Sequence, residues 1–411
     1  MEMWMWIVIL IIVIGLSIGL LYYVINRFTK FRFIDKIEDS TIFKNKERDR
    51  GRAADFTQSA KKEFLEKNPG QKYKPKRSWL RILISIVIVI IINVITYFLT
   101  SGVEMVVILL HLGVIWAIVE GIFALIRVVF KKDYTRGKVY LPGIIAIVIT
   151  TVYLLIALYY GSTVAITNYT IDTDKNVEHL RIVQISDSHL GVTMRADTFP
   201  AEVEKIKAQN PDIVLITGDY VDDDSTKEDL DACCKALSTI DCKYGVYFSY
   251  GNHDKGYYDS SVRGYDNEYL INSLESNGVK ILEDQIVNLD DQYLIIGRAD
   301  KSNKNRISIG QLVSTIDPTQ FANEYSVVLD HQPNDYDAES AANVDLVLSG
   351  HTHGGQLLPI NRIGEYIGAN DYTDGHIKID NTDFIVSSGI SAWAIRFKSG
   401  TRSEIVVVDV E

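Results

Sequence analysis

Polar clusters that could bind metal ions follow one another between residues 187 and 353 of the 411-residue chain. Each cluster supplies carboxylate, amide or imidazole donors, which suit borderline or hard divalent metals, and none contains a cysteine. In chain order the clusters are Asp187-Ser-His189, Gly218-Asp219-Tyr-Val-Asp222, Gly251-Asn252-His253-Asp254, His331 in Leu-Asp-His-Gln-Pro, and Gly350-His351-Thr-His353. Together they offer enough ligands for two ions.

The spacing within the clusters indicates how two ions would be held. Asp187 and His189 leave one turn in the same general direction and can bind one ion, while Asp219 can bridge both. The turn at His351 and His353 offers one imidazole to each ion. Two metals roughly 3.5–4 Å apart are a recurrent device for splitting phosphate esters. Each cluster alone is a weak signal, but five in order are hard to produce by accident.

Every cluster follows a predicted strand, and these strands alternate with predicted helices. The strands are expected at 180–186, 212–217, 245–250, 325–329 and 344–349, and the helices at 197–209 and 226–240. Because open α/β sheets place their ligands at the carboxyl ends of strands, the clusters should meet at one edge. Apolar segments at 377–379, 384–387 and 404–410 are expected to add short β elements, which could form a second sheet packed on the first.

The ordered motifs resemble those of the calcineurin-like metallophosphoesterase superfamily, which run Asp-x-His, Gly-Asp, Gly-Asn-His-Asp/Glu, His and Gly-His-x-His. The stretch Gly350–Gln356, reading Gly-His-Thr-His-Gly-Gly-Gln, is similar to a membrane-associated bacterial branch. The resemblance covers roughly residues 179–411. It implies an α/β fold, a four-layer α-β-β-α sandwich in which helices flank two β-sheets, with a dinuclear site at one edge.

The resemblance also implies roles for individual residues. One metal would take Asp187, His189, Asp219 and His353, and the second would share Asp219 and take Asn252, His331 and His351. His253 would donate to the phosphoryl oxygen or the leaving group, and Asp254 would orient that imidazole. A hydroxide bridging two divalent ions, Mn²⁺, Zn²⁺ or iron, is the expected nucleophile.

Several residues near these motifs have two interpretations. Arg396 lies with Trp393 and Phe397 in a stretch similar to one that closes the site in relatives, and it could bind a phosphate bidentately or form a structural ion pair. Asp330 could support His331 or be exposed. His179 and His376 are expected on the surface, and the three cysteines, an odd number, are expected to be buried or free thiols.

The two parts of the chain carry net charges of opposite sign. Residues 1–160 contain 22 Lys+Arg and 12 Asp+Glu, a net charge of about +10. The remaining residues contain 20 Lys+Arg and 41 Asp+Glu, a net charge of about −21, and the two sum to the net charge of −11. An acidic domain repels a nucleic-acid backbone, so we expect no nucleic-acid partner.

Four apolar runs precede residue 162, at 4–25, 82–99, 105–129 and 140–160, each close to the ~20 residues that span a bilayer. The segment 27–81 carries 17 Lys+Arg, and the loop 130–138 adds four more. The positive-inside rule places both in the cytoplasm and the acidic domain outside. Within the spans, Asn93 and His111 are expected to pair, and Glu120 to fasten helices rather than serve transport.

The expected organisation is a transmembrane helix at 1–26, a basic cytoplasmic segment at 27–81, transmembrane helices 2–4 at 82–160, a linker at 161–178 and the catalytic domain at 179–411. We therefore expect a multi-pass plasma-membrane metallophosphoesterase, a metal-dependent phosphoric ester hydrolase whose domain is extracytoplasmic. The expected substrate is a lipid head group, a lipid-linked sugar or a wall polymer, hydrolysed as a phosphodiester. The alternatives are a cytoplasm-facing nucleotide-lipid pyrophosphatase and a non-catalytic membrane sensor or transporter.

Overall fold

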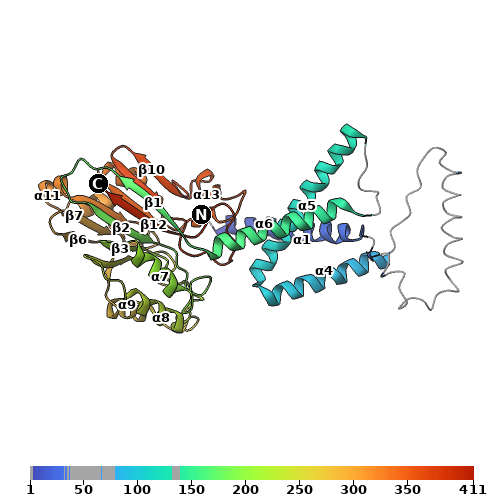
Figure 1. The fold of residues 1–411 in the computed structure, drawn as a ribbon, viewed down its shortest axis with the longest axis horizontal. Coiled ribbons are helices and arrows are strands. Elements are labelled where there is room, and N and C mark those ends of the chain that lie inside the picture. The colour runs from blue at the N-terminus through green and yellow to red at the C-terminus, as the bar shows by residue number, and fades with distance from the viewer. Residues whose placement is uncertain (1–2, 32, 35–36, 38–65, 67–78, 132–138) are drawn as a thin grey trace. The chain divides into compact units, whose positions relative to one another are not determined.

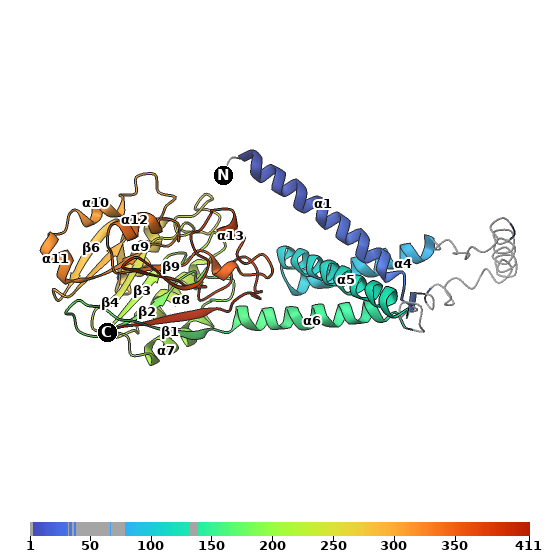
Figure 2. The same cartoon turned by 90° about the horizontal axis from the view of Figure 1, so that it is seen from above.

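The computed structural model describes residues 3–31, 33–34, 37, 66, 79–131 and 139–411, with the side chains of the first helix described from Ile14 onward. These residues form two compact units, Met1–Tyr153 and Leu154–Glu411. Figures 1 and 2 show the elements of each unit. Most of the basic segment 27–81 and of the loop 130–138 lies outside the described residues.

Among the described residues before Thr163, the structure contains four long apolar helices. They are α1 (Met3–Phe28), α4 (Trp79–Leu99), α5 (Gly102–Phe130) and α6 (Leu141–Ser162). Within the described residues, Leu80–Leu99, Gly102–Phe130 and Leu141–Ser162 are long and apolar enough to cross a membrane. The described part of α1, Ile14–Phe28, is a shorter apolar helix. Three of the predicted spans are thus found at full length.

Glu120 of α5 is the centre of a polar cluster among these helices. Its carboxylate lies 2.8 Å from Arg27 Nε and 2.6 Å from Lys30 Nζ, and it also accepts a hydrogen bond from the Tyr140 hydroxyl. These contacts join α5 to α1 and to the start of α6, as the helix-fastening interpretation predicts. The predicted pairing of Asn93 with His111 is wrong. Each side chain instead bonds the carbonyl four residues earlier in its own helix.

The second compact unit, Leu154–Glu411, contains the expected catalytic domain and is here called the catalytic unit; it has two six-stranded mixed sheets. The first has the order β1 (Ala165–Ile171), β12 (Glu404–Val410), β2 (Leu180–Ile185), β3 (Ile213–Thr217), β4 (Gly245–Ser249) and β5 (Val279–Leu282). The second has the order β10 (Gly375–Ile379), β11 (Thr382–Val386), β9 (Leu346–Ser349), β8 (Tyr325–Leu329), β7 (Tyr293–Gly297) and β6 (Gln285–Leu289).

Three apolar cores define the layers between and outside these sheets. Alternate strand residues such as Ile182 and Val327 fill the space between the two sheets. The opposite face of the first sheet packs on α7 (Phe199–Ala208), α8 (Lys227–Leu237) and α9 (Asn267–Ser276). The opposite face of the second packs on α10 (Ile309–Val313) and α12 (Tyr336–Ala341), with α11 (Pro318–Asn323) between them in the chain. This is the expected four-layer sandwich.

The main difference from the sequence analysis lies before the first predicted strand. Residues 165–171, part of the expected linker 161–178, form β1, which pairs in parallel with β12 along its whole length. Its sequence Ala-Ile-Thr-Asn-Tyr-Thr-Ile mixes apolar and polar residues, because an edge strand buries little of its outer face. The sequence analysis also assigned no elements to the residues of β5–β7 or of α9–α12.

Candidate metal centre

The ends of five strands bring the predicted ligands to one edge of the sandwich. The strands β2, β3 and β4 run parallel in the first sheet, and β8 runs parallel to β9 in the second. Hydrogen bonds join the sheets at this edge, from Gln184 Nε2 to the Ser349 carbonyl (2.9 Å) and between His331 Nδ1 and the Thr217 carbonyl (2.8 Å). The clusters that follow β2, β3 and β4 therefore lie close to those that follow β8 and β9.

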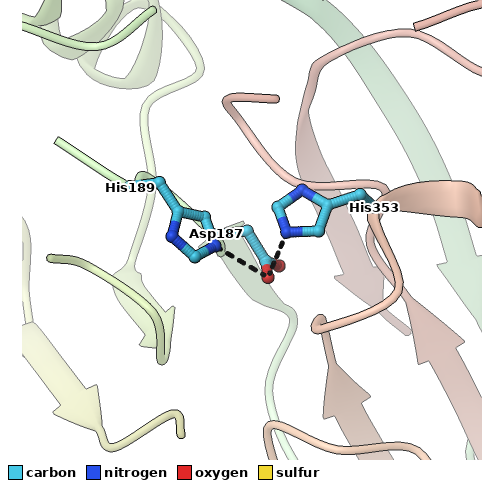
Figure 3. A group of neighbouring side chains, drawn as sticks. All are labelled: Asp187, His189 and His353. Atoms are coloured by element: carbon cyan, nitrogen blue, oxygen red, sulfur yellow. Dashed lines mark ion pairs between the residues drawn. The ribbon is translucent and has the colours of Figure 1, made fainter. Parts of the chain in front are cut away.

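Asp187, His189 and His353 form the first group of possible ligands (Figure 3). Asp187 Oδ1 lies 3.9 Å from His189 Nε2 and 3.4 Å from His353 Nε2, and all three side chains are buried. The two imidazoles lie side by side, with ring centroids 5.0 Å apart, one from the loop after β2 and one from the loop after β9, and both face the Asp187 carboxylate. Such a group offers one ion two nitrogens and an oxygen.

Asp219, His331 and His351 form the second group. Asp219 Oδ2 lies 3.0 Å from His331 Nε2 and also 3.6 Å from His189 Nε2 of the first group. The Asp219 carboxylate therefore lies between the two groups, where a ligand shared by two ions must lie. The ring of His351 is 5.3 Å from that of His331.

The backbone at the ligands is in a strained conformation. Asp187, His189, Asp219, His351 and His353 all have positive φ, between 36° and 70°, a region that residues other than glycine rarely adopt. Backbone strain of this kind persists only where the surrounding structure imposes it, and it gathers at functional sites. Five of the seven predicted ligands share it.

Two glycines allow the loops to approach the ligands this closely. A Cβ at Gly218, whose φ is 77°, would collide with the backbone nitrogen of Gly251. At Gly350 it would collide with the Ser186 hydroxyl and with the Asp187 carboxylate. Any larger residue at either position would push apart the loops that carry the two groups.

The hydrogen bonding of the predicted ligands shows whether their donor atoms are available to metal ions. The Nε2 atom of His189 and the Oδ1 atom of Asn252 are buried without a hydrogen bond, and His331 Nε2 lies 3.0 Å from the Asp219 carboxylate, a predicted ligand of the same ion. Meanwhile His189 Nδ1 lies 3.0 Å from Asp222 and His331 Nδ1 bonds the Thr217 carbonyl, which leaves each Nε2 as the ligand atom. Buried, unpaired nitrogen and oxygen donors of this kind fit divalent ions.

The protonation states of most of the ligands also suit metal binding. Burial would raise the pKa of Asp187 and of Asp219, but the surrounding histidines outweigh it and hold both below the usual range. Burial lowers the pKa of His351 to about 4 and that of His353 to about 3, so both are neutral at pH 7. His331 differs, since Asp219 outweighs burial and raises its pKa, and a metal there must displace a proton.

Asp222, to which the sequence analysis assigned no role, connects two histidines. Its Oδ2 lies 3.0 Å from His189 Nδ1 and its Oδ1 lies 3.0 Å from His253 Nδ1. Asp254, predicted to orient His253, instead accepts hydrogen bonds from the backbone nitrogens of residues 219, 220, 221 and 251. The carboxylate that orients His253 is therefore Asp222, and Asp254 fixes the loop that carries Asp219.

Aromatic residues surround His253 on its open side. The ring of Trp393 lies 5.8 Å from it and that of Tyr257 lies 4.9 Å away. Tyr257 also accepts a 2.6 Å hydrogen bond from Asn252 Nδ2, which turns the amide so that Oδ1 stays unpaired. Sequence reasoning missed Tyr257 because it follows the motif by three residues in a loop without a pattern. Arg396 is half-buried, and its role as a phosphate ligand stays a prediction.

Asp330 is buried and paired rather than exposed. Its Oδ2 lies 2.8 Å from Arg298 Nη1, and Arg306 contacts the same oxygen. Arg298 is 2% exposed and also contacts Asp335 and Glu339. Asp330 is therefore not exposed, and its partners are two arginines, whereas the Nδ1 atom of the neighbouring His331 bonds the Thr217 carbonyl.

The remaining histidines and the cysteines lie where they were expected. His179 is 48% exposed and pairs with Asp409 at 3.0 Å, and His376 pairs with Asp383 at 2.8 Å. Cys233 and Cys234 are buried free thiols, and Cys242 is a partly buried one.

Comparison with known proteins identifies the fold and site as those of a family. Residues 180–355 match the model of the calcineurin-like phosphoesterases. An uncharacterized metallophosphoesterase of Aquifex aeolicus is 30% identical over 194 residues, which cover 46% of this chain and 70% of that protein. The chain belongs to the calcineurin-like phosphoesterase family.

Two relatives match a larger share of the chain. An uncharacterized metallophosphoesterase of Campylobacter jejuni is 28% identical over 72% of this chain and 76% of its own length. A bovine protein named as a transmembrane protein with a metallophosphoesterase domain is 27% identical over 68% of this chain and 64% of its own length. Since Leu154–Glu411 makes up less than two thirds of the chain, both matches include part of the N-terminal helices.

A solved structure of a dimetal phosphatase from Danio rerio covers 51% of this chain and 87% of its own, with 14% identity and a TM-score of 0.32. From the family and its site, the chain is a metal-dependent phosphoesterase with a dinuclear centre for divalent ions. The apolar helices and the relative named as transmembrane make it a membrane protein.

Proposed function

We propose that the chain is a membrane-anchored phosphodiesterase that hydrolyses an amphiphilic phosphate ester at the outer surface of the membrane. The observation that carries the proposal is the position of the metal centre beside the chain segment that packs on the end of α6. Trp393, which contacts His253, begins a segment whose Ser403 bonds the carbonyls of Tyr160 and Gly161. The site therefore opens close to the last turn of a membrane helix.

In the proposed reaction, one ion would be held by Asp187, His189 and His353, and the other by Asn252, His331 and His351, with Asp219 available to both. Two bound ions, Mn²⁺, Zn²⁺ or iron, would supply positive charge to the phosphate and make water a stronger nucleophile. His253 gives a proton to the departing oxygen, and Asp222 keeps its Nδ1 protonated so that Nε2 faces the substrate.

A cavity beside Asn252 favours a diester over a monoester. It has a volume of about 340 Å³ and is lined by Asn252, Lys255, Glu283, Asp300 and Lys304, among others. Its polar lining suits a hydroxylated or phosphorylated head group. A phosphate monoester carries one organic group, whereas a diester carries two. This cavity can bind the polar organic group of a diester, while the apolar organic group lies near Trp393.

The proposed orientation rests on charge. The basic segment 27–81 and the loop 130–138 are assigned to the cytoplasm, which after four spans leaves the acidic catalytic unit outside. There the accessible esters are lipid head groups, lipid-linked sugars and wall polymers. The acidic unit makes nucleic acid a poor substrate, because phosphate backbones are bound by basic surfaces.

The proposal is tested on the full chain in detergent, stripped of metal and then supplied with Mn²⁺ or Zn²⁺. We expect hydrolysis of bis-p-nitrophenyl phosphate to exceed that of p-nitrophenyl phosphate. Asp219→Asn should reduce it about a thousand-fold, the equivalent of roughly 4 kcal/mol in the transition state. A preference for the monoester would overturn the diester assignment.

A matched variant separates catalysis from damage to the fold. Asp224 is exposed and five residues from Asp219 in the chain, so Asp224→Asn should keep full activity. Binding of two metal ions without hydrolysis of either ester would favour the sensor function instead. Failure to bind two ions would contradict the dinuclear assignment itself.

A further inference from the structure

The loop that follows His353 presents several large apolar side chains to the surface. We call residues 357–367, which include α13 (Ile363–Tyr366), the apolar loop. Ile363 is 52% exposed, Tyr366 83% and Ile367 62%, and Leu358 and Ile360 are exposed as well. Soluble surfaces scatter such residues singly, so five of them within ten positions mark an interaction surface.

Hydrogen bonds connect the apolar loop to the end of α6, the last turns of which belong to the same compact unit. The backbone nitrogen of Leu358 donates to the Ser399 hydroxyl (2.9 Å), and Ser399 N donates to the Gln356 carbonyl (2.8 Å). One residue earlier, Lys398 N donates to the Ala157 carbonyl of α6 (2.9 Å). Segment 398–399 thus lies between the apolar loop and the helix.

The contact with Ala157 indicates how far segment 398–399 lies from the C-terminal end of α6, along the axis of this helix. Ala157 is five residues before Ser162, the last residue of α6, which at 1.5 Å per residue is about 7 Å below the helix end. Leu155, Ile156 and Tyr159 on these turns are exposed, as expected for a helix that still faces lipid. Interfacial segments bury their apolar side about 5–10 Å into a membrane, which is the same range of depth.

The polar residues around the apolar loop are those of a membrane interface. Arg402 lies with its guanidinium 5.6 Å from the Tyr160 ring, and Arg362 of the apolar loop pairs with Glu365 at 3.4 Å. Tyrosines and arginines at the end of a spanning helix are typical of the head-group region, where the ring or the stem is apolar and the tip is wet.

We propose that the apolar loop inserts into the leaflet that α6 meets at its C-terminal end, and that this contact holds the metal centre against the bilayer surface. The surface is continuous with a membrane helix through Ser399 and Lys398, so its occupant is lipid. This inference does not require the proposed substrate, since it concerns where the loop lies.

The same contacts connect the apolar loop to the catalytic residues. Gln356, directly before the loop, accepts a hydrogen bond from Trp393 N and donates to the Trp393 and Ile395 carbonyls. Trp393 in turn contacts His253. An ester whose tail stays in the leaflet could thus reach the metal centre without leaving the membrane.

The test uses the full chain in liposomes of phosphatidylcholine and phosphatidylglycerol, with Cys242→Ser to remove the partly buried thiol. A bimane fluorophore is attached at Ile363→Cys, and phosphatidylcholine with brominated acyl chains is added in increasing proportion. We expect several-fold stronger quenching at this position than at Thr319→Cys on α11. In both views α11 lies at the end of the catalytic unit opposite α13.

Equal quenching at the two positions would overturn the proposal. A second variant carries the label at Tyr366→Cys together with Ile360→Glu, Ile363→Glu and Ile367→Glu, and it should lose most of the quenching that Tyr366→Cys alone shows. Quenching that survives these charges would also overturn it. Hydrolysis of bis-p-nitrophenyl phosphate in the same liposomes is measured independently of quenching, so a failure of membrane docking is distinguishable from a failure of the proposed function.

Discussion

At the scale of single residues, Asp222 couples the metal centre to the proton donor. One oxygen faces His189, a candidate metal ligand, and the other faces His253, beside the substrate position. A carboxylate in this position fixes both imidazoles in the tautomer that leaves Nε2 facing the site. Burial lowers the pKa of His253, but the hydrogen bond that it donates to Asp222 and the nearby carboxylates outweigh burial, so this pKa is raised.

Asp222→Asn should therefore change both the rate and its pH dependence. Loss of the hydrogen bonds to two imidazoles should reduce kcat/KM about ten- to hundred-fold. Since His253 donates only while protonated, activity falls as the pH rises through its pKa, and a lower pKa moves this alkaline limb to lower pH. A pH profile with bis-p-nitrophenyl phosphate measures the shift. An unchanged limb would show that His253 is not the proton donor.

At the scale of elements, the ends of β7 and β8 are joined to α12 through Arg298. Three carboxylates, those of Asp330, Asp335 and Glu339, contact one buried guanidinium. The pairing compensates the cost of burying these charges only while every partner is present. Because His331 follows Asp330 directly, the network also sets the position of a metal ligand.

Arg298→Met should destabilise the catalytic unit by roughly 3–5 kcal/mol, because it leaves Asp330 and Glu339 buried without their cation. The expected fall in melting temperature is about 10 °C. As a matched control, Arg362→Met removes an exposed pair with Glu365 and should change stability by less than about 1 kcal/mol. A melting temperature for Arg298→Met equal to that of the control would contradict this account of the network.

At the scale of the whole molecule, bound ions should stabilise the catalytic unit. The candidate ligands come from loops that follow five strands in two sheets, so ions bound to them connect both sheets. Ions at a hundred times their dissociation constant add roughly 2.7 kcal/mol. Chelation should lower the melting temperature by several degrees, and Asp219→Asn should abolish that effect. A chelator that leaves the wild-type melting temperature unchanged would argue against ions that join the sheets.

The membrane topology gives a further whole-molecule prediction. In intact cells, a membrane-impermeant maleimide should label Thr319→Cys in the catalytic unit, because that unit is assigned to the outside. A cysteine at Ser59 in the basic segment should react only after the cells are opened. The reverse pattern would place the catalytic unit in the cytoplasm and favour the nucleotide-lipid pyrophosphatase.

The family, the order of the ligand motifs and most of the apolar helices can be predicted from the amino-acid sequence. These follow from residue types and short spacings, such as Asp187-x-His189 at a strand end or about twenty apolar residues in a row. Because the residue types and short spacings of a motif are enough to suggest metal binding, the ligands can be predicted without knowledge of the tertiary contacts. The parallel strands that carry the ligands are likewise predictable from the sequence, because both their faces are buried and their residues are almost all apolar.

The residues that support those ligands are found only in the folded structure. Asp222 rather than Asp254 orients His253, Trp393 lies beside it from 140 positions away, and β1 completes a sheet by pairing with β12 at the other end of the domain. Such contacts join segments that are distant in the chain, and neither residue type nor spacing encodes which distant partner a side chain meets. The continuity of the apolar loop with the end of α6 is of the same kind, because it depends on how the chain folds back on itself.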